Sequence, residues 1–334
     1  MKRLLFVGLV ALATAASAVA ASLKCAPYRG AISADASGRV LFADNADRPA
    51  YPASVTKLMT ALLVLEDVRA KKYTFFDKVT ATPDVYRCEP SWVGIKPGEQ
   101  MTVRDLLLAL MVESANDAAI ALGIHSAGSF DGFVAKMNAR AKELGMNATT
   151  YYNPNGLPPN KAKRYPWKNF NVSTAADQLK LAVQLLKYSE ILEFTSVKTA
   201  ALVKTPTGFR VSVTRQVNRP LRETKFAPGE SLVKNLRNHN NIMVKDKQKV
   251  IGPDGKECVD GLKTGYIDAG GSSVVLTGTR KGKRVIVVVL GSDSQLGAKG
   301  RVVKGGSEIR DEHARRLLVD ALDLWPQEAY TVRQ

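Results

Sequence analysis

The order of the predicted elements indicates an α+β protein, in which an antiparallel sheet is flanked by helices and interrupted by an all-helical lobe. Two short strand patterns, at 31–34 and 39–42, lie near the start of the chain. Helical patterns follow, and strand patterns return before a last amphipathic helix at 307–324. Because strands from both ends of the chain pair in one sheet, we expect the middle of the chain to form an inserted lobe.

The helices are predicted from apolar spacing and from N-caps. The first is an amphipathic helix indicated by leucines at i, i+4 and i+7, which are Leu58, Leu62 and Leu65. The second is expected at 102–112, where Thr102 and Asp105 form a capping box. Two further helices, at 129–144 and 173–186, each begin with a serine that can serve as the N-cap.

The strands near the C-terminal end are predicted as a hairpin. Two β-branched apolar runs, 272–279 and 284–290, are separated by a short basic turn that contains one glycine. Together with the helices, this hairpin gives the expected extents of the two lobes. They are about 28–57 and 195–325 for the α/β lobe and about 58–194 for the helical lobe.

The first 20 residues have the three parts of a secretory signal peptide. Lys2 and Arg3 form the basic start, an apolar and alanine-rich stretch follows, and the Ala-x-Ala at 18–20 is a small-residue cleavage site. A buried N-terminal helix is the alternative, which this order of parts disfavours. We therefore expect an exported, soluble mature chain, 21–334, on the periplasmic or cell-wall side.

Composition excludes several classes of protein. The 334 residues are 45% hydrophobic and 24% charged, which is enough to bury a sizeable core and is not typical of disordered or fibrous chains. The net charge of +17 would suit anionic wall polymers or membrane headgroups, although solvated surface lysines are the simpler interpretation. No nucleic-acid-binding motif is present, so a nucleic-acid partner is not expected.

Three short motifs carry the chemistry. They are Ser54-Val55-Thr56-Lys57, Ser114-Ala115-Asn116 and Lys263-Thr264-Gly265. The second and third patterns each occur once, whereas Ser-x-x-Lys recurs at 231–234, so at least one of its two matches is due to chance. In helical geometry, side chains at i and i+3 have Cβ atoms about 5–6 Å apart, so the amine of Lys57 can reach the hydroxyl of Ser54.

For that contact to activate a serine, the lysine has to be neutral. A free lysine has a pKa of about 10.4, so it is mostly protonated at neutral pH. Burial and a second cation would both lower the pKa of Lys57, and Lys263 is the candidate for that cation. The sequence therefore predicts a site in which two lysines and two serines, Ser54 and Ser114, are in contact.

The motifs and their surroundings resemble the low-molecular-weight penicillin-binding proteins, the serine D-alanyl-D-alanine carboxypeptidases. The resemblance covers roughly 28–325 and implies a β-lactamase/transpeptidase-like fold. The segments that carry it are Pro52-Ala53-Ser54, Lys57-Leu58-Met59-Thr60, Lys96-Pro97-Gly98-Glu99, Thr102–Leu107, Glu113–Ala118, Asn153–Leu157, Val259–Tyr266 and Ile309-Arg310.

The resemblance implies three catalytic residues. Ser54 is similar to the acylated nucleophile of the family and Lys57 to its general base. Ser114 is similar to the hydroxyl that passes a proton toward the leaving amine. No metal or other cofactor is implied.

The resemblance also implies six substrate-binding residues, which are Asn116, Lys263, Thr264, Gly265, Tyr266 and Arg310. The amide of Asn116 would position the substrate peptide, and Lys263 with Thr264 would bind its carboxylate. Gly265 would leave the strand edge open for the substrate backbone. The N–H groups of Ser54 and Tyr266 would form an oxyanion hole, and Arg310 would help hold the carboxylate.

The implied activity is removal of the terminal D-alanine from peptidoglycan stem peptides, with β-lactams as covalent inhibitors. A D,D-endopeptidase that cuts cross-links is the alternative, because the motifs serve both reactions. A β-lactamase is disfavoured because no glutamate lies between Glu143 and Glu190, and a non-catalytic wall-binding protein because Ser54 and Lys57 are both present. Many relatives continue into a β-rich domain and a membrane anchor, which we do not expect in a chain that ends at Gln334.

The cysteines and histidines suggest no separate site. Three cysteines in an exported chain allow at most one disulfide; among the three pairings we favour Cys88 with Cys258, but three unrelated buried thiols are expected ahead of any disulfide. Lys24 argues against lipid modification of Cys25. The histidines are too scattered for a zinc site and are expected to be structural or surface residues: His125, His239 and His313.

Overall fold

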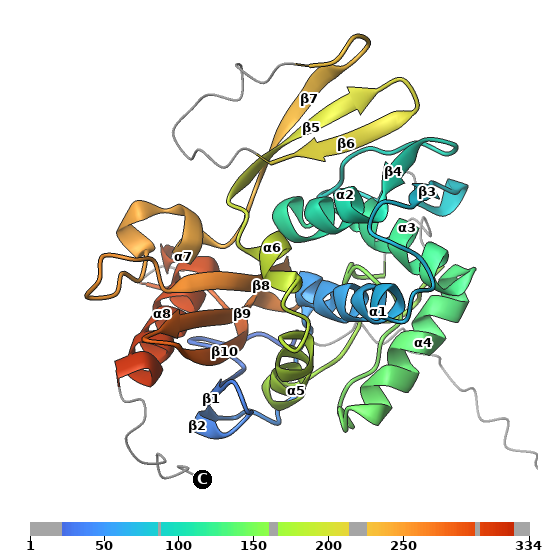
Figure 1. Cartoon of the computed structure of the whole chain (residues 1–334). Coiled ribbons are helices and arrows are strands. Elements are labelled where there is room, and N and C mark those ends of the chain that lie inside the picture. Colours follow the sequence, from blue (N-terminus) through green and yellow to red (C-terminus); the bar gives the residue numbers. More distant parts are fainter. Residues whose placement is uncertain (1–21, 86–87, 160–165, 214–225, 298–300, 324–334) are drawn as a thin grey trace, which may run out of the picture.

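The computed structural model gives the arrangement of most of the chain (Figure 1). The residues that it describes are 22–85, 88–159, 166–213, 226–297 and 301–323. The predicted signal peptide, 1–20, lies outside them. The helices and strands below are labelled as in Figure 1.

The main sheet has five antiparallel strands in the order β2-β1-β10-β9-β8. Their bounds are β1 Gly30–Asp35, β2 Val40–Asp44, β8 Val259–Ile267, β9 Gly271–Arg280 and β10 Lys283–Ser292. The strands expected at the two ends of the chain therefore pair in one sheet, and the hairpin β9–β10 is present. Strand β8, which carries the third motif, is an edge strand.

Helices cover both faces of this sheet, which explains why β9 and β10 are buried almost throughout. The C-terminal helix α8 (Gly306–Asp323) packs on β9 and β10, and α5 (Ala175–Leu185) packs on β1 and β10 from the opposite face. The predicted α+β class, an antiparallel sheet flanked by helices, is confirmed.

The inserted lobe is built around α1 (Lys57–Arg69). Its other helical segments are η2 Pro83–Val85, α2 Val103–Leu108, the π-helical turn η3 Ala109–Glu113, α3 Asn116–Ala127, α4 Phe130–Glu143 and α6 Ile191–Thr195. The capping box is present, since Thr102 Oγ1 accepts from the N–H of Asp105 at 3.1 Å. The cap of α5 is Thr174 and not Ser173, because Thr174 Oγ1 accepts from the N–H of Asp177.

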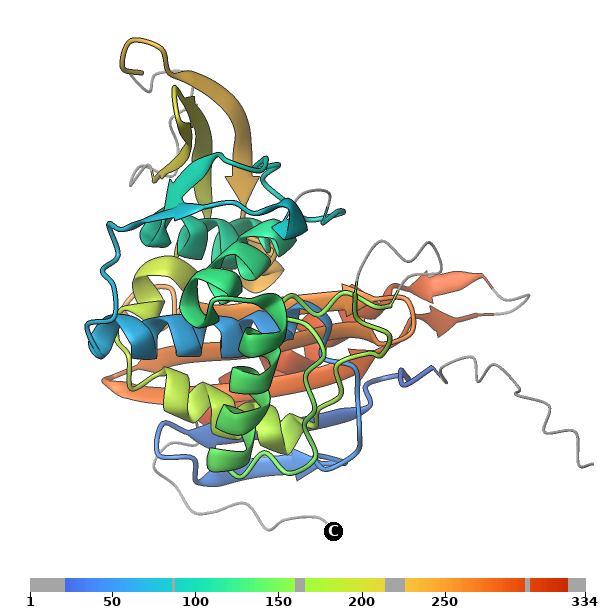
Figure 2. The same ribbon diagram turned by 90° about the vertical axis from the view of Figure 1, so that its right-hand side faces the viewer.

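The inserted lobe is not all-helical, so that expectation is corrected. A second five-stranded sheet has the order β3-β4-β6-β5-β7. Its strands are β3 Lys78–Thr80, β4 Gln100–Thr102, β5 Thr199–Thr205, β6 Gly208–Ser212 and β7 Ser231–Arg237. Figure 2 shows this sheet projecting beyond the helices, away from the main sheet.

This second sheet also changes the expected lobe boundaries. Strands β5 to β7, which we assigned to the α/β lobe, join β3 and β4 of the inserted lobe. The sequence concealed the pairing because β3 and β4 have three residues each, which is too short to display strand alternation. Smaller elements complete the structure: α7 Asn241–Val244, η5 Asp246–Gln248, β11 Gln295–Leu296 and β12 Val302–Lys304.

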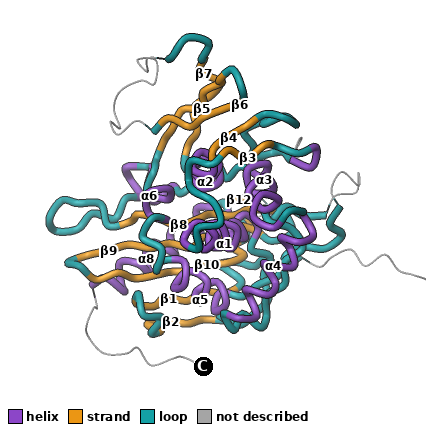
Figure 3. Tube along the Cα trace, turned by 45° about the vertical axis from the view of Figure 1, so that its right-hand side comes forward, coloured by secondary structure: helices purple, strands orange, loops and turns teal. Residues whose placement is uncertain are grey.

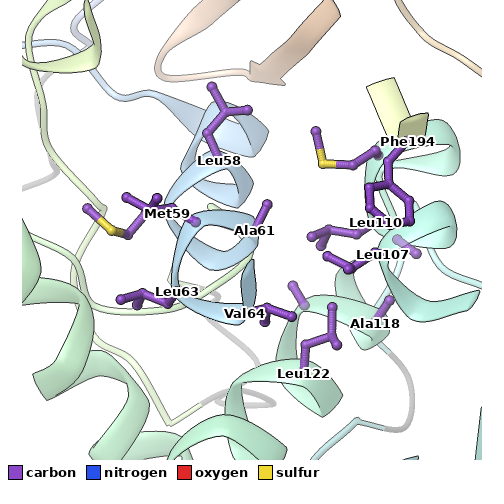
Figure 4. Close-up of a cluster of buried hydrophobic side chains, with 14 of the residues drawn as sticks. Leu58, Met59, Ala61, Leu63, Val64, Leu107, Leu110, Ala118, Leu122 and Phe194 are labelled. Atoms are coloured by element: carbon purple, nitrogen blue, oxygen red, sulfur yellow. The ribbon is translucent and has the colours of Figure 1, made fainter. Parts of the chain in front are cut away.

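Helix α1 lies at the centre of the molecule, between the two sheets (Figure 3). Every residue from 57 to 65 is buried, so the helix is enclosed on all sides and is not amphipathic as predicted. Figure 4 shows its apolar side chains packed against those of α2, α3 and α6. This enclosure removes the first turn of α1, including Lys57, from solvent.

The cysteines are free thiols, so the favoured Cys88–Cys258 disulfide is not formed. The reason is their position. Cys88 belongs to the core around α1, whereas Cys258 belongs to the core between the main sheet and α8.

None of the helices within the described ranges is by itself long and apolar enough to cross a membrane. The pair α3 and α4 meets the criterion of length and composition only when taken together, with an 84° bend between them.

Candidate active site

Ser54 lies in a tight turn that leads directly into the central helix. The turn is a 3-10 helix, η1 (Ala53–Thr56), and α1 begins at Lys57. The Ser54 side chain is partly exposed, whereas Lys57 is fully buried. The Nζ atom of Lys57 is 2.9 Å from Oγ of Ser54. The contact expected between these two side chains is therefore present.

Two more oxygen atoms surround the amine of Lys57. Oδ1 of Asn116 lies 2.8 Å from Nζ, and the backbone carbonyl oxygen of Asn155 lies 2.7 Å from it. A carbonyl oxygen can only accept, so Lys57 donates to both. A neutral amine has then used both of its hydrogens, and its lone pair faces the hydroxyl of Ser54. In this form Lys57 is placed to take the proton of Ser54.

Two features favour this neutral form of Lys57. Burial is the larger, and the nearby cation of Lys263 is the second. Together they lower the pKa of Lys57 well below its ordinary value, against the opposing charge of Asp117. Both causes are the ones expected from the sequence.

Lys263 lies on the edge strand β8 and is buried as well. Its Nζ donates to the backbone carbonyl of the neighbouring Thr264 at 2.9 Å. Burial and, second, the charge of Arg310 lower the pKa of Lys263 to about 7. The charged and neutral forms of this amine are therefore both accessible near neutral pH.

Gly265 brings β8 directly against the turn that carries the serine. A Cβ atom at Gly265 would lie 2.6 Å from the carbonyl oxygen of Pro52 and 2.9 Å from the backbone N of Ser54. Close packing of two backbones therefore requires the glycine. Because β8 is an edge strand, the expectation that Gly265 also leaves this edge open for the substrate backbone stays a prediction. The next residue, Tyr266, has an exposed side chain whose hydroxyl donates to Asp268 at 2.8 Å.

Ser114 occupies a strained position at the end of η3. Its backbone is left-handed, with φ 61° and ψ 32°, and its side chain is buried. A left-handed conformation costs a non-glycine residue about 1–2 kcal/mol, and it persists where surrounding contacts impose it. The predicted helix at 102–112 is thus an α-helix that widens into a π-helical turn before the serine, a feature that often marks functional sites.

The expected contact among all four side chains is only partly correct. Ser54 and Lys57 are within hydrogen-bonding distance. Among the described residues, no hydrogen bond joins Ser114 or Lys263 to either of them, because the amine of Lys263 bonds to the carbonyl of Thr264. Lys263 acts on Lys57 through its charge instead.

The segment after Ser114 holds a loop beside the site. The N–H of Asn116 donates to the carbonyl of Ser91 at 2.7 Å. The buried carboxylate of Asp117 accepts from three consecutive backbone N–H groups, those of Val93, Gly94 and Ile95. Segment 91–95 is therefore fixed to the start of α3.

Arg310 lies in the second turn of α8 and is buried. Its Nε and Nη2 donate to Oδ1 of Asp311 at 2.8 and 2.6 Å. The charge of Arg310 is, after burial, the second cause of the lowered pKa of Lys263, so the guanidinium influences the site electrostatically. Its role in holding the substrate carboxylate stays a prediction.

The sequence analysis missed the role of the loop at 153–157. Asn155 supplies a carbonyl to Lys57, and Asn153 Oδ1 accepts from the N–H of Gly156 at 2.6 Å. Gly156 has φ +84°, and a Cβ atom there would lie 1.9 Å from the carbonyl oxygen of Ala53. The Asn-Pro-Asn-Gly string predicts a tight turn, but nothing in it names the lysine as its partner.

His239, which we expected to be structural or a surface residue, is exposed, and the charges of both site lysines act on its imidazole. Part of its side chain reaches solvent, but partial burial of the ring and the charge of Lys263 lower its pKa to about 4. Its imidazole is therefore neutral at pH 7. The other two histidines pack edge-on or tilted against tyrosines, His125 on Tyr73 and His313 on Tyr28.

Comparison with known proteins decides the family. The model of the D-alanyl-D-alanine carboxypeptidase family matches residues 26–294. The chain belongs to this family. It is similar to the D-alanyl-D-alanine carboxypeptidase DacF of Bacillus subtilis, with 30% identity over 80% of this chain and 58% of the relative. It is also similar to a D-alanyl-D-alanine endopeptidase of Escherichia coli, with 26% identity over 75% of this chain and 67% of the relative.

Solved structures of the D-alanyl-D-alanine carboxypeptidase family and of penicillin-binding proteins share its fold. The carboxypeptidase DacD of Francisella tularensis has a TM-score of 0.71 and 25% identity, over 95% of this chain and 75% of that one. Penicillin-binding protein D2 of Listeria monocytogenes, in its ampicillin-bound form, has a TM-score of 0.62 and 28% identity, over 88% and 96%. The chain spans 58% of the length of DacF, so the activity of the whole relative is not carried over directly.

Proposed function

We propose that the protein is a serine D-alanyl-D-alanine carboxypeptidase, which removes the terminal D-alanine of peptidoglycan stem peptides. The observation that carries this proposal is the buried amine of Lys57, 2.9 Å from Oγ of Ser54 and held by two carbonyl oxygens. Membership of the D-alanyl-D-alanine carboxypeptidase family supports the choice of substrate.

In the first step Ser54 attacks the carbonyl carbon between the two D-alanines. Lys57 takes the hydroxyl proton as the bond forms, and the carbonyl oxygen acquires negative charge. We assign the stabilisation of that charge to the N–H groups of Ser54 and Tyr266. The close packing of Gly265 on the Ser54 turn supports this assignment, because it brings the next residue of β8 beside that turn.

The leaving amine needs a proton before the C–N bond breaks. We assign its delivery to Ser114, which gives its hydroxyl proton to the nitrogen and takes up the proton that Lys57 received from Ser54, so that Lys57 is neutral again. Asn116, two residues further along the chain, is hydrogen-bonded to Lys57. The bond then breaks, D-alanine departs, and Ser54 is left as an ester. Water attacks this ester with Lys57 as base, which releases the shortened peptide and restores the serine.

Binding of the substrate carboxylate is assigned to Lys263, Thr264 and Arg310. The low pKa of Lys263 reflects its burial and, second, its repulsion by the buried cation of Arg310. A carboxylate placed between them would relieve it and favour the charged form of Lys263. Asn116 is held by Lys57 through Oδ1, so its Nδ2 is directed elsewhere and can donate to the substrate backbone.

A β-lactam would acylate Ser54 in the same way, and the ester would persist if deacylation is slow. The ampicillin-bound form of the Listeria relative supports this expectation. The secretory signal predicted at 1–20 supports action outside the cytoplasm, where peptidoglycan lies.

The reaction is tested by incubating the purified protein with two substrates, a monomeric muropeptide that ends in D-alanyl-D-alanine and a cross-linked dimer. We expect D-alanine release from the monomer, seen by mass spectrometry and absent in Ser54→Ala. Conversion of dimers to monomers without that release would establish the endopeptidase alternative, which the Escherichia coli relative favours. Absence of both reactions would contradict the proposal.

A further inference from the structure

The second Ser-x-x-Lys match in the chain has a different use from the first. Ser231 and Lys234 lie on strand β7, and no hydrogen bond joins their side chains within the described part of the chain, so they do not form a nucleophile–base pair. Lys234 is directed toward the active site instead. Its Nζ donates to the carbonyl of Trp92 at 2.7 Å and to Oε1 of Glu113 at 2.9 Å.

Glu113 is the residue directly before Ser114. Its other carboxylate oxygen, Oε2, accepts from the backbone N–H of Arg237 at 3.4 Å. Strand β7 therefore holds both oxygens of the carboxylate that ends the π-helical turn. A negative charge at the C-terminal end of a helix is unfavourable, and the cation of Lys234 offsets it.

Trp92, the other partner of Lys234, belongs to segment 91–95. That segment is already fixed to Asn116 and Asp117 through backbone hydrogen bonds. Lys234 thus joins the two structures that flank Ser114, the turn that ends in Glu113 and the loop that contains Trp92. Neither the turn nor the loop is part of β7. Lys234 therefore acts as a brace that links both of them to this strand.

We propose that Lys234 is a positioning residue, which through Glu113 and Trp92 keeps Ser114 in the left-handed conformation that the reaction uses. The proposal rests on the proton-delivery role assigned to Ser114 under the proposed function. The proposed role gives a function to the second Ser-x-x-Lys match, which does not form a nucleophile–base pair. Lys234 itself touches none of the reacting atoms.

The same sheet contains a matched control. Lys204 on the neighbouring strand β5 forms an ion pair with Glu99, and neither residue belongs to the three motifs. Side-chain exposures are 37% and 18% for Lys234 and Glu113, and 40% and 19% for Lys204 and Glu99. Removing either lysine therefore disturbs a similar ion pair in the same sheet.

The test compares the rate of Ser54 acylation by penicillin in Lys234→Met and Lys204→Met. We expect a loss of about 10- to 100-fold in Lys234→Met, the effect of a small misplacement of a reacting group, and the wild-type rate in Lys204→Met. Lys234→Arg should recover most of the rate, because a guanidinium can donate to both the carbonyl and the carboxylate. Glu113→Gln, which keeps the size of the side chain, should lose rate in the same direction.

Two further readouts separate positioning from charge and from general stability. Lys234 faces Glu113 and His239, with the site lysines Lys57 and Lys263 beyond, so removing its charge could also act electrostatically. If Lys234 acts by positioning, the acylation rate of Lys234→Met should be lower at every pH, and the midpoints of the pH–rate profile should be unchanged. If it acts through its charge, a midpoint of that profile should shift. Positioning also predicts faster amide exchange in segment 91–95 of Lys234→Met, and not in Lys204→Met.

The proposal would be overturned if Lys234→Met were acylated at the wild-type rate. It would also be overturned if the midpoint of its pH–rate profile shifted while amide exchange in segment 91–95 stayed normal. If Lys234→Met does not fold, Lys234→Arg and Glu113→Gln still test the proposal. Positioning predicts that Lys234→Arg keeps most of the acylation rate and that Glu113→Gln loses rate. Failure of the wild-type protein to be acylated would instead contradict the proposed function. In that case amide exchange still tests the brace by itself.

Discussion

The amine of Lys57 lies 2.9 Å from the hydroxyl of Ser54 and is enclosed on its other sides by protein. This relationship exists because Lys57 opens a helix that is buried on every face. A surface helix with the same two residues would leave the lysine hydrated and charged. The enclosure of α1 therefore converts an ordinary i, i+3 pair into a nucleophile and its base.

The first prediction concerns the pH dependence of acylation. The rate should fall at low pH, where Lys57 is protonated. Because the cation of Lys263 lowers the pKa of Lys57, the variant Lys263→Met should raise that pKa and move the acid limb to higher pH. Lys263→Arg keeps the charge and should leave the limb near its wild-type position. The measurement is the rate of penicillin acylation against pH, and identical limbs in wild type and Lys263→Met would count against the electrostatic coupling.

The second prediction concerns stability. Folding lowers the pKa of Lys263 from 10.5 to about 7, so the unfolded chain binds a proton more readily between these values. The wild-type protein therefore loses stability as the pH falls from about 10 to about 7. Lys263→Met should be more stable by about 1–2 kcal/mol at pH 6, and this advantage should vanish toward pH 10.

The measurement is denaturant unfolding of wild type and Lys263→Met at several pH values. Lys263→Arg is the control, because its charge does not titrate in this range. An advantage that stays constant with pH would show that packing, and not protonation, distinguishes the two proteins.

The third prediction tests the contact between the 153–157 loop and the serine turn. Gly156→Ala combines left-handed strain with a Cβ atom 1.9 Å from the carbonyl oxygen of Ala53. We expect a loss of about 3 kcal/mol or more in the free energy of unfolding, together with slower acylation. Gly145→Ala is the matched control, since Gly145 has φ +68° but no atom within 4 Å of the added Cβ.

The control should lose only about 1 kcal/mol and keep its acylation rate. Urea unfolding and the acylation assay give both quantities for each variant. Equal losses in the two variants would mean that the loop yields to the extra methyl group and does not fix the serine turn.

Much of the site could be predicted because its parts are local strings. Ser54 and Lys57 are three residues apart in helical geometry, so their contact follows from spacing alone. The role of Lys263 in lowering the pKa of Lys57 followed from chemistry, since a nearby cation, like burial, favours the neutral form of a lysine. Strands β1, β2, β9 and β10 and the last helix also followed from local strand patterns and apolar spacing.

What could not be predicted depends on long-range backbone contacts. The backbone carbonyl of Asn155 accepts from Lys57, which is 98 residues away in the sequence. Every residue has such a carbonyl, so the residue type does not indicate this contact. The π-helical turn before Ser114 and the enclosure of α1 are set by packing, which periodicity does not report. The second sheet escaped notice because the pairing of β4 with β6 needs only one close approach, at Gly208.

The central claim is that Ser54 is a nucleophile activated by Lys57, and intact-mass spectrometry after incubation with penicillin tests it most directly. We expect one stable adduct of the mass of penicillin on the wild-type protein, and none on Ser54→Ala or Lys57→Met. An unmodified wild-type protein with intact antibiotic would contradict the claim, as would an adduct that persists in Ser54→Ala. An unmodified protein with hydrolysed antibiotic would contradict slow deacylation and indicate a β-lactamase.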